Sequence, residues 1–218
     1  MGFLDDIFKK YKKNNSAALT VEDISKLPTF TDVDLGLYWN RVTIDNLAEN
    51  EQYFNEIATW ANDENIQKYI SYSVPIDQLF RSFVVDTAER NDYNDRCNLY
   101  FCFNDDKDLI GATYVTAPIG RNTDSTIEYI VVNPKFQRAG IGTKMIKSIS
   151  SFDKYFNNGY QSSGFYASVN SENMASSKAL LKNNYKVVST NWTDLGKHYT
   201  VLYLSSRDMG SQGRNFEQ

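Results

Sequence analysis

The sequence predicts an α/β fold, in which helices flank a central sheet. Two observations lead to this class. Segments with apolar residues at strand spacing alternate with segments whose apolar residues recur at helical spacing. Their order is a strand, two helices, three strands, a helix, a strand, a helix and two strands, which is typical of one mixed domain. With 41% hydrophobic residues, the 218-residue chain can form a packed core.

The first half of this pattern begins with "LYWNRVTI", which predicts a strand because β-branched and aromatic residues dominate it. The segment "IDNLAENEQYFNEIATWAND" predicts a helix that turns Leu47, Phe54, Ile57 and Ala61 inward, and Pro75 is suited to the first turn of a second helix. The turn "DDKD" separates two further strands. The strands of this half are expected at residues 37–44, 98–104, 109–117 and 126–132.

The second half repeats the alternation. An amphipathic helix after Gly142 carries Met145, Ile146, Ile149 and Phe152 on one side. The segment "ENMASSKALLKNN" predicts a second helix, which ends where two asparagines follow. The remaining strands are expected at residues 164–169, 185–192 and 198–205, the last two as a hairpin.

Three regions are expected along the chain. Residues 1–30 predict an amphipathic helix and a linker, and the helix would contact a membrane surface or a partner, or pack on its own domain. Residues 31–206 predict the folded domain. Residues 207–218 lack apolar content and predict a disordered tail.

Composition excludes several classes of protein. A formal net charge of −4 argues against nucleic-acid binding, which needs a basic surface. No apolar run reaches the ~20 residues that span a bilayer, and no signal-peptide pattern opens the chain. Cys97 and Cys102 fall on opposite faces of one predicted strand, which argues against a disulfide and fits a cytoplasmic protein. A single histidine, His198, argues against a zinc site, and no metal is expected.

The most informative stretch is "VVNPKFQRAGIGTKMIKSI", in which Gly140 and Gly142 stand between a strand and a helix. Glycines at such a junction allow a tight turn and a close ligand, and amides at a helix start bind phosphate. A dinucleotide-binding fingerprint would need a third glycine, and a P-loop would need Gly-Lys-Ser/Thr, so neither motif fits. Amides from Arg138 to Thr143 are therefore expected to bind phosphate groups, with Arg138 and Lys144 either adding charge or simply facing solvent.

The residues Gln137-Arg138-Ala139-Gly140-Ile141-Gly142 resemble the Gln/Arg-x-x-Gly-x-Gly/Ala signature of the GNAT superfamily of acyl-CoA-dependent N-acetyltransferases. The later segment "SVNSENMASSKALLKNNYKVV" resembles the family's second segment, with Asn173 at the strand end and Asn184-Tyr185 at the usual Gly-Phe corner. The resemblance covers roughly residues 35 to 206. A weaker likeness, Trp60-Ala61-Asn62-Asp63, is to the branches that act on ribosomal proteins and amino sugars.

This resemblance implies a fold, a co-substrate and a set of contacts. It implies a GNAT-like α/β fold with a mixed, largely antiparallel central sheet flanked by helices, and acetyl-CoA as the acetyl donor. Main-chain groups at the end of the strand expected at residues 126–132 would pair with pantetheine. Asn173 would bind the CoA arm or cap a helix. The residues expected to contact the cofactor are Ile130, Val131, Val132, Gln137, Arg138, Ala139, Gly140, Ile141, Gly142, Thr143, Asn173 and Ser176.

Glu128 is the candidate general base, because related enzymes place a Glu or His near this strand position. Strand periodicity predicts that Glu128 shares a face with Ile130 and Val132, half-buried beside the core. The family's usual tyrosine acid is replaced by Leu180. Tyr185 and Tyr199 are possible substitutes, and Ser176 and Ser177 lie nearer but are poor acids.

The expected reaction is acetyl transfer to a primary amine by direct attack in a ternary complex, and the amine could belong to a small molecule, an amino sugar or a protein N-terminus. The rival hypotheses are a non-catalytic acyl-CoA-binding or partner-binding module and a peripheral membrane protein. A homodimer is also possible. His198 could meet the acceptor or be structural. Acidic residues that could attract an amine, or merely face solvent, are Asp63, Glu64, Asp86, Glu89 and Asp92.

Overall fold

The computed structural model describes residues 29–61, 74–89, 95–118, 124–157, 162–194 and 196–209, together with residues 63, 66, 68 and 69. The predicted N-terminal helix and the acidic residues Glu64 and Asp92 lie outside these ranges. So do residues 210–218. No helix within the described ranges is both long enough and apolar enough to cross a membrane.

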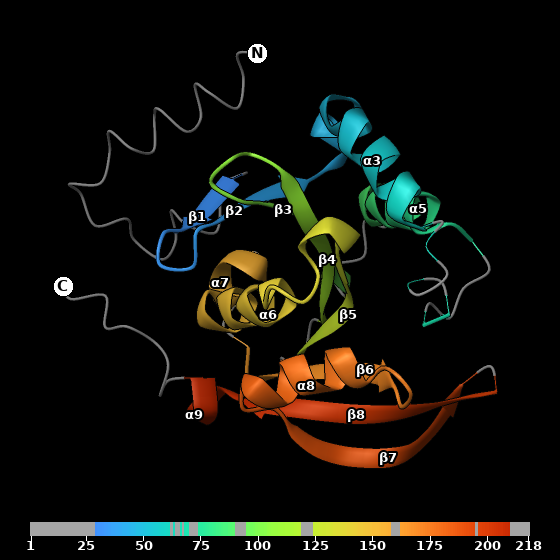
Figure 1. Ribbon diagram of the computed structural model, residues 1–218, viewed down its shortest axis with the longest axis vertical. Coiled ribbons are helices and arrows are strands. Elements are labelled where there is room, and N and C mark those ends of the chain that lie inside the picture. The colour runs from blue at the N-terminus through green and yellow to red at the C-terminus, as the bar shows by residue number, and fades with distance from the viewer. Residues whose placement is uncertain are drawn as a thin grey trace.

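An eight-stranded sheet organises the described part of the chain, in the order β1-β2-β3-β4-β5-β6-β8-β7 (Figure 1). Every neighbouring pair is antiparallel except β5 and β6, which are parallel. The predicted mixed, largely antiparallel sheet is therefore confirmed. The strands are β1 (Thr29–Asp32), β2 (Leu37–Val42), β3 (Asp95–Phe103), β4 (Leu109–Pro118), β5 (Asp124–Val132), β6 (Gly164–Asn170), β7 (Lys186–Asp194) and β8 (Lys197–Ser205).

The helices fall into groups along the chain. The two predicted helices before β3 are α3 (Glu51–Ala61) and α5 (Ile76–Glu89), and the two predicted later are α6 (Ile141–Ser151) and α8 (Met174–Lys182). The sequence predicts the first of these helices from Ile44, but residues 44–50 form two 3-10 turns, Ile44–Asn46 and Ala48–Asn50, and α3 begins only at Glu51. Short elements that the sequence pattern did not predict are the 3-10 turn Pro134–Phe136 and the single turns α7 (Asp153–Phe156) and α9 (Ser206–Met209).

Two apolar clusters lie on opposite faces of the sheet. One joins the sheet to α6 and α8 through Met145, Ile146 and Leu180. The other joins it to α3 and α5 through Phe54 and Phe80. Alternate residues of β3 serve the two clusters, as strand geometry requires. Cys102 accordingly packs in the first cluster and Cys97 against the second, on the opposite faces that the sequence predicted.

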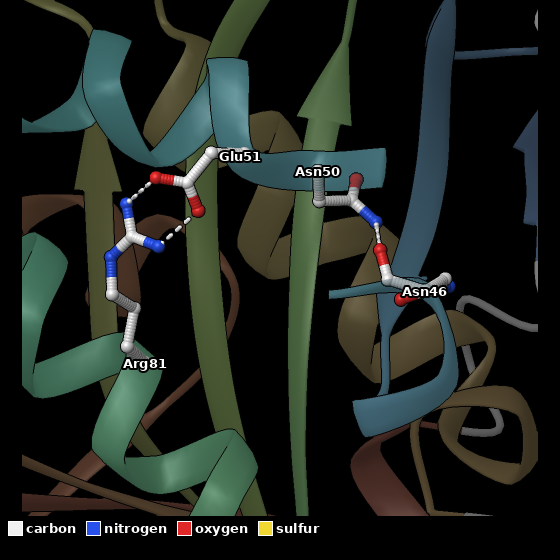
Figure 2. A network of polar contacts seen from close by, with 4 residues as sticks. All are labelled: Asn46, Asn50, Glu51 and Arg81. Atoms are coloured by element: carbon white, nitrogen blue, oxygen red, sulfur yellow. Dashed lines mark hydrogen bonds and ion pairs between the residues drawn. The ribbon is translucent and has the colours of Figure 1, made fainter. Parts of the chain in front are cut away.

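Polar contacts fix α3 and α5 against each other (Figure 2), and a further contact joins the start of α3 to β2. The Arg81 guanidinium pairs with both carboxylate oxygens of Glu51 and lies 4.4 Å from the centroid of the Phe54 ring. The guanidinium also lowers the pKa of Glu51. At the start of α3, the Asn50 side chain donates to the Asn46 carbonyl (2.8 Å) and accepts from Asn40 of β2 (2.8 Å). The two helices are thus tied together above one face of the sheet.

The structure differs from expectation at both ends of the domain. Strand β1 extends the sheet by one strand that the sequence pattern did not indicate, because only Phe30 of its four residues is a large apolar residue. Phe30 packs against Phe152 and Tyr155, at centroid distances of 4.5 and 4.9 Å. The tail was expected to be disordered from residue 207, which is wrong for residues 207–209. These belong to α9, where Asp208 pairs with Lys186 of β7 (3.0 Å).

Candidate active site

The central feature of the site is the parting of two parallel strands. Strands β5 and β6 pair only from Asp124 opposite Gly164 to Ile127 opposite Ala167. Beyond these residues β5 continues to Val132 and β6 to Asn170 without pairing to each other. Ligands of α/β folds bind beyond the carboxyl ends of parallel strands, where neighbouring strands diverge. The parting therefore marks the part of the sheet that is open to a ligand.

The backbone of β5 presents polar groups to this opening. Asn133 donates its amide to the Ile110 carbonyl of β4 (2.9 Å), so the amides that face β4 are those of Asn133 and, by strand alternation, Val131. The amides and carbonyls of Ile130 and Val132 point the other way, towards the side where β6 has parted. The main-chain groups of Ile130 and Val132 can therefore pair with an extended ligand, as the resemblance implied. The main-chain groups of Val131 are already hydrogen-bonded to β4 and cannot do so.

The glycine-containing loop begins directly after β5. Gly140 is left-handed (φ 78°) and forms the N-cap of α6, and Arg138 is also left-handed (φ 65°). The first main-chain bond of the helix runs from the Lys144 amide to the Gly140 carbonyl (3.0 Å). The amides of residues 138 to 143 precede this bond, in the turn before α6 and in its first turn, where the helix supplies few partners of its own. Amides at a helix N-terminus can bind phosphate, and that role stays a prediction here.

Space around the loop also suits a ligand. A Cβ atom at Gly140 would meet nothing within 4 Å, so this side of the loop is open. A Cβ atom at Gly142 would lie 3.5 Å from a Val132 side-chain methyl, which shows that α6 starts against the end of β5. Arg138 and Lys144 are both exposed. The outward backbone groups of β5 and the amides at the start of α6 therefore lie next to each other, at the opening where β5 and β6 part.

Two side chains expected to bind the cofactor make hydrogen bonds within the protein instead. Gln137 donates its side-chain amide to the Val132 carbonyl (3.1 Å), which leaves the outward groups of Ile130 and the Val132 amide for a ligand. The Asn173 side-chain oxygen accepts from the Ser176 amide (3.1 Å) and caps α8. The helix-capping alternative for Asn173 is thus confirmed, and Ser176 contributes its amide to that cap.

Glu128 does not share a face with Ile130 and Val132, and the prediction that it does is wrong. A bulge gives β5 one extra residue here, because Tyr114 pairs with Tyr129 while the next residue, Val115, pairs with Ile127. The bulge interrupts the two-residue alternation. The Glu128 carboxylate turns to the α3/α5 face, where the Thr116 hydroxyl donates to it (3.0 Å), and the side chain is exposed rather than half-buried.

The residues considered as proton donors lie apart from this face. Leu180 is only 3% exposed and packs in the cluster under α6 and α8. Tyr185 is in the same cluster, and burial raises the pKa of its hydroxyl well above the ordinary value. Tyr199 is buried with its ring against Trp192, at a centroid distance of 5.0 Å. Neither the Tyr185 ring nor the Tyr199 ring is exposed at the opening.

Other candidates are placed as follows. His198 is exposed at the start of β8, and its carbonyl accepts from the Ser171 amide just beyond β6, so it lies at the same end of the sheet as the opening. Asp86 is exposed on α5 and Asp63 is half-buried. Within the described residues, no three His, Cys, Asp or Glu side chains gather as metal ligands.

Thr116 is a site residue that sequence reasoning missed. No glycine or other irregularity in "TIEYIVV" marks the bulge, and strict alternation places Glu128 on the wrong side of β5. Only the register against β4 brings Thr116 and Glu128 together. A sequence signal for this contact would have to come from the partner strand, and "LIGATYVTA" carries none.

Solved structures with this fold include two acetyltransferases. The spermidine N-acetyltransferase from Vibrio cholerae, in complex with CoA and spermine, is 14% identical with a TM-score of 0.58, over 80% of this chain and 98% of that one. A probable acetyltransferase from Staphylococcus epidermidis is 15% identical with a TM-score of 0.54, over 78% of this chain and 99% of that one. At such low identity these likenesses show a shared fold.

One sequence match identifies the family of this chain. No curated protein matches the chain. The model of the acetyltransferase (GNAT) family matches residues 54–184, a stretch that contains α5, β5, the glycine loop, α6 and all of α8. Because this match spans more than half of the sequence, the chain belongs to the GNAT acetyltransferase family.

Proposed function

We propose that this acetyltransferase moves an acetyl group from acetyl-CoA to a primary amine, by direct attack within a ternary complex. The observation that carries the proposal is the opening where β5 parts from β6, beside the amides at the start of α6. An extended pantetheine arm needs strand-like hydrogen-bonding partners, and a pyrophosphate needs amides and positive potential. Ile130 and Val132 supply the first, and residues 138–143 supply the second.

The chemistry then requires a base on the acceptor side of the opening. Glu128 lies on the face covered by α3 and α5, with its carboxylate exposed. It accepts a proton from the ammonium group, directly or through water, and the neutral nitrogen attacks the thioester carbonyl carbon. The new C–N bond forms, the C–S bond breaks, and the CoA sulfur leaves with the bonding electron pair. The acetylated nitrogen loses its surplus proton to water, which gives the neutral amide, and the thiolate takes up a proton.

The source of that last proton distinguishes this chain from the family pattern. Leu180 stands in place of the usual tyrosine and is buried, and the alternatives Tyr185 and Tyr199 are buried as well. A CoA thiolate has a moderate basicity, so it can leave without a positioned acid and take its proton from water. We therefore propose a reaction in which base catalysis and positioning supply the rate enhancement.

The acceptor is proposed to be a small primary amine. The Vibrio cholerae protein with this fold is a spermidine N-acetyltransferase, which makes spermidine and spermine the first amines to test. An amino sugar and an N-terminal peptide complete the panel, because the sequence leaves all three classes open. The acceptor face here offers the Glu128 carboxylate for any of these cations.

The second candidate, a module that binds acyl-CoA without turnover, is favoured by the buried Leu180. Release of free CoA thiol in the presence of each amine separates the two candidates. We expect thiol release by the wild-type chain with at least one amine. Glu128→Gln should reduce turnover about 100-fold or more while the Kd for acetyl-CoA stays within twofold.

The matched control is Glu49→Gln, at an exposed carboxylate in the turn before α3, which should turn over like the wild type. Thiol release by no member of the panel, with acetyl-CoA still bound, would favour the non-catalytic module. Equal turnover by Glu128→Gln and the wild type would remove Glu128 from the mechanism.

A further inference from the structure

The bulge in β5 decides what surrounds the Glu128 carboxylate. On either side of Glu128 the register with β4 is regular, with Tyr129 opposite Tyr114 and Thr126 opposite Thr116. Glu128 is the extra residue and has no partner of its own in the ladder. A bulged residue lacks the cross-strand neighbour that would otherwise hold its side chain. Its direction must therefore be set by another contact.

Thr116 supplies that contact. Tyr114 packs in the cluster under α3 and α5, and Thr116, two residues further along β4, points to the same face. Its hydroxyl donates to Oε1 of Glu128 at 3.0 Å. The carboxylate also lies close enough to Tyr114 for its charge to contribute to the raised pKa of that buried phenol, although burial is the larger cause. Both observations place the carboxylate over β4.

An exposed glutamate without such a contact samples several rotamers, and only some of them aim an oxygen at the acceptor nitrogen. A hydrogen bond to Oε1 restricts the carboxylate and leaves Oε2 able to accept a proton. We propose that Thr116 is a positioning residue, which holds the Glu128 carboxylate over β4 so that Oε2 faces the amine. This inference rests on the proposed acetyl transfer and on the role of Glu128 in it.

The test compares Thr116→Val, Thr116→Ser and Thr116→Ala in the full chain, with the amine that the wild type acetylates. Valine keeps the shape and removes the donor, and serine keeps the donor. We expect kcat to fall about tenfold in Thr116→Val and Thr116→Ala, while Thr116→Ser stays within about twofold of the wild type. The KM for the amine and the Kd for acetyl-CoA should stay within twofold in all three.

The matched control is Thr126→Val, which makes the same change at the partner of Thr116 in the strand ladder. Thr126 is half-buried like Thr116, and the variant should keep wild-type kcat. In a double-mutant cycle, Thr116→Val should add nothing to Glu128→Gln, because the group it positions is already changed.

Three results would overturn the inference. The first is wild-type kcat in a folded Thr116→Val or Thr116→Ala chain. The second is a loss in Thr116→Ser as large as that in Thr116→Val. The third is a Thr116→Val effect that persists undiminished in the Glu128→Gln background, which would mark a general effect on the sheet. A wild-type chain that binds acetyl-CoA but releases no thiol would instead refute the proposed function, and this inference with it.

Discussion

The Gln137 side-chain amide donates a hydrogen bond of 3.1 Å to the Val132 carbonyl. This bond spans the turn between β5 and the glycine loop, and it fixes the start of α6 against the end of the strand. Below it, the buried Asn133 side chain donates to the Leu109 carbonyl and accepts from the Lys135 amide, at 3.0 Å each. The loop is thus held in one shape before any ligand binds, which lowers the ordering cost of binding.

Gln137→Met removes this donor at similar side-chain length. The expected cost of about 0.5–1.5 kcal/mol falls on the loop conformation that binds the pyrophosphate, so the Kd for acetyl-CoA should rise about 2- to 10-fold. Calorimetric titration measures the Kd directly. Lys135→Met, at another exposed position of the same turn, is the control and should bind within twofold of the wild type. Equal affinities of Gln137→Met and the wild type would contradict a role for this bond.

Asn184 ends α8 in a left-handed conformation (φ 64°). Alanine is strained there, whereas glycine is not, so Asn184→Ala should be less stable than Asn184→Gly by about 1 kcal/mol. Chemical denaturation of the two variants measures the difference in the free energy of unfolding. Equal stability of the two would show that the backbone at this corner relaxes to an ordinary conformation.

Three buried tyrosines predict a steep loss of stability in alkali. Burial is the main cause that raises the pKa of Tyr100, Tyr114 and Tyr185 above the ordinary value of 10.0. Above about pH 10 the unfolded chain loses these protons while the folded chain keeps them. The free energy of unfolding should therefore fall by about 4 kcal/mol per pH unit from these groups, and it should be unaffected by them below pH 9.

Tyr185→Phe tests this prediction at one residue. The Tyr185 hydroxyl is buried and makes no well-formed hydrogen bond among the described residues, although the nearby Ser150 hydroxyl lowers its pKa against the larger effect of burial. The variant should reduce the alkaline slope by about a third and cost nothing at pH 7. Urea unfolding at pH 7 and between pH 9 and 11 provides both values, with Tyr166→Phe, at a half-buried position, as control. An unchanged slope would contradict the assigned burial.

The predictable features of the site are those encoded locally. Apolar periodicity placed Met145, Ile146 and Ile149 on the buried side of α6, and the two glycines marked the turn before that helix. Asn184 matches the glycine of the family's Gly-Phe corner, and it adopts the left-handed conformation that suits such a place. In each case the determining interactions lie within about ten residues of sequence.

The features that escaped prediction depend on distant partners. The bulge at Glu128 arises from the register between β4 and β5, so periodicity along β5 alone assigned the wrong face. Strand β1 is stabilised by Phe152 and Tyr155, more than 120 residues away. The commitment of Gln137 to the Val132 carbonyl likewise depends on how the intervening turn folds.

The proposed function requires acetyl-CoA to bind at the start of α6. A comparison of acetyl-CoA affinity between two variants of Gly140 tests this requirement. Aspartate and asparagine have nearly the same shape, and both tolerate the left-handed conformation of this position (φ 78°). Only aspartate puts a negative charge beside the proposed pyrophosphate. In calorimetric titrations of acetyl-CoA, the wild type and Gly140→Asn should bind with similar Kd, and Gly140→Asp should bind at least about tenfold more weakly. Equal binding by the two variants, or no binding by the folded wild type, would contradict the account.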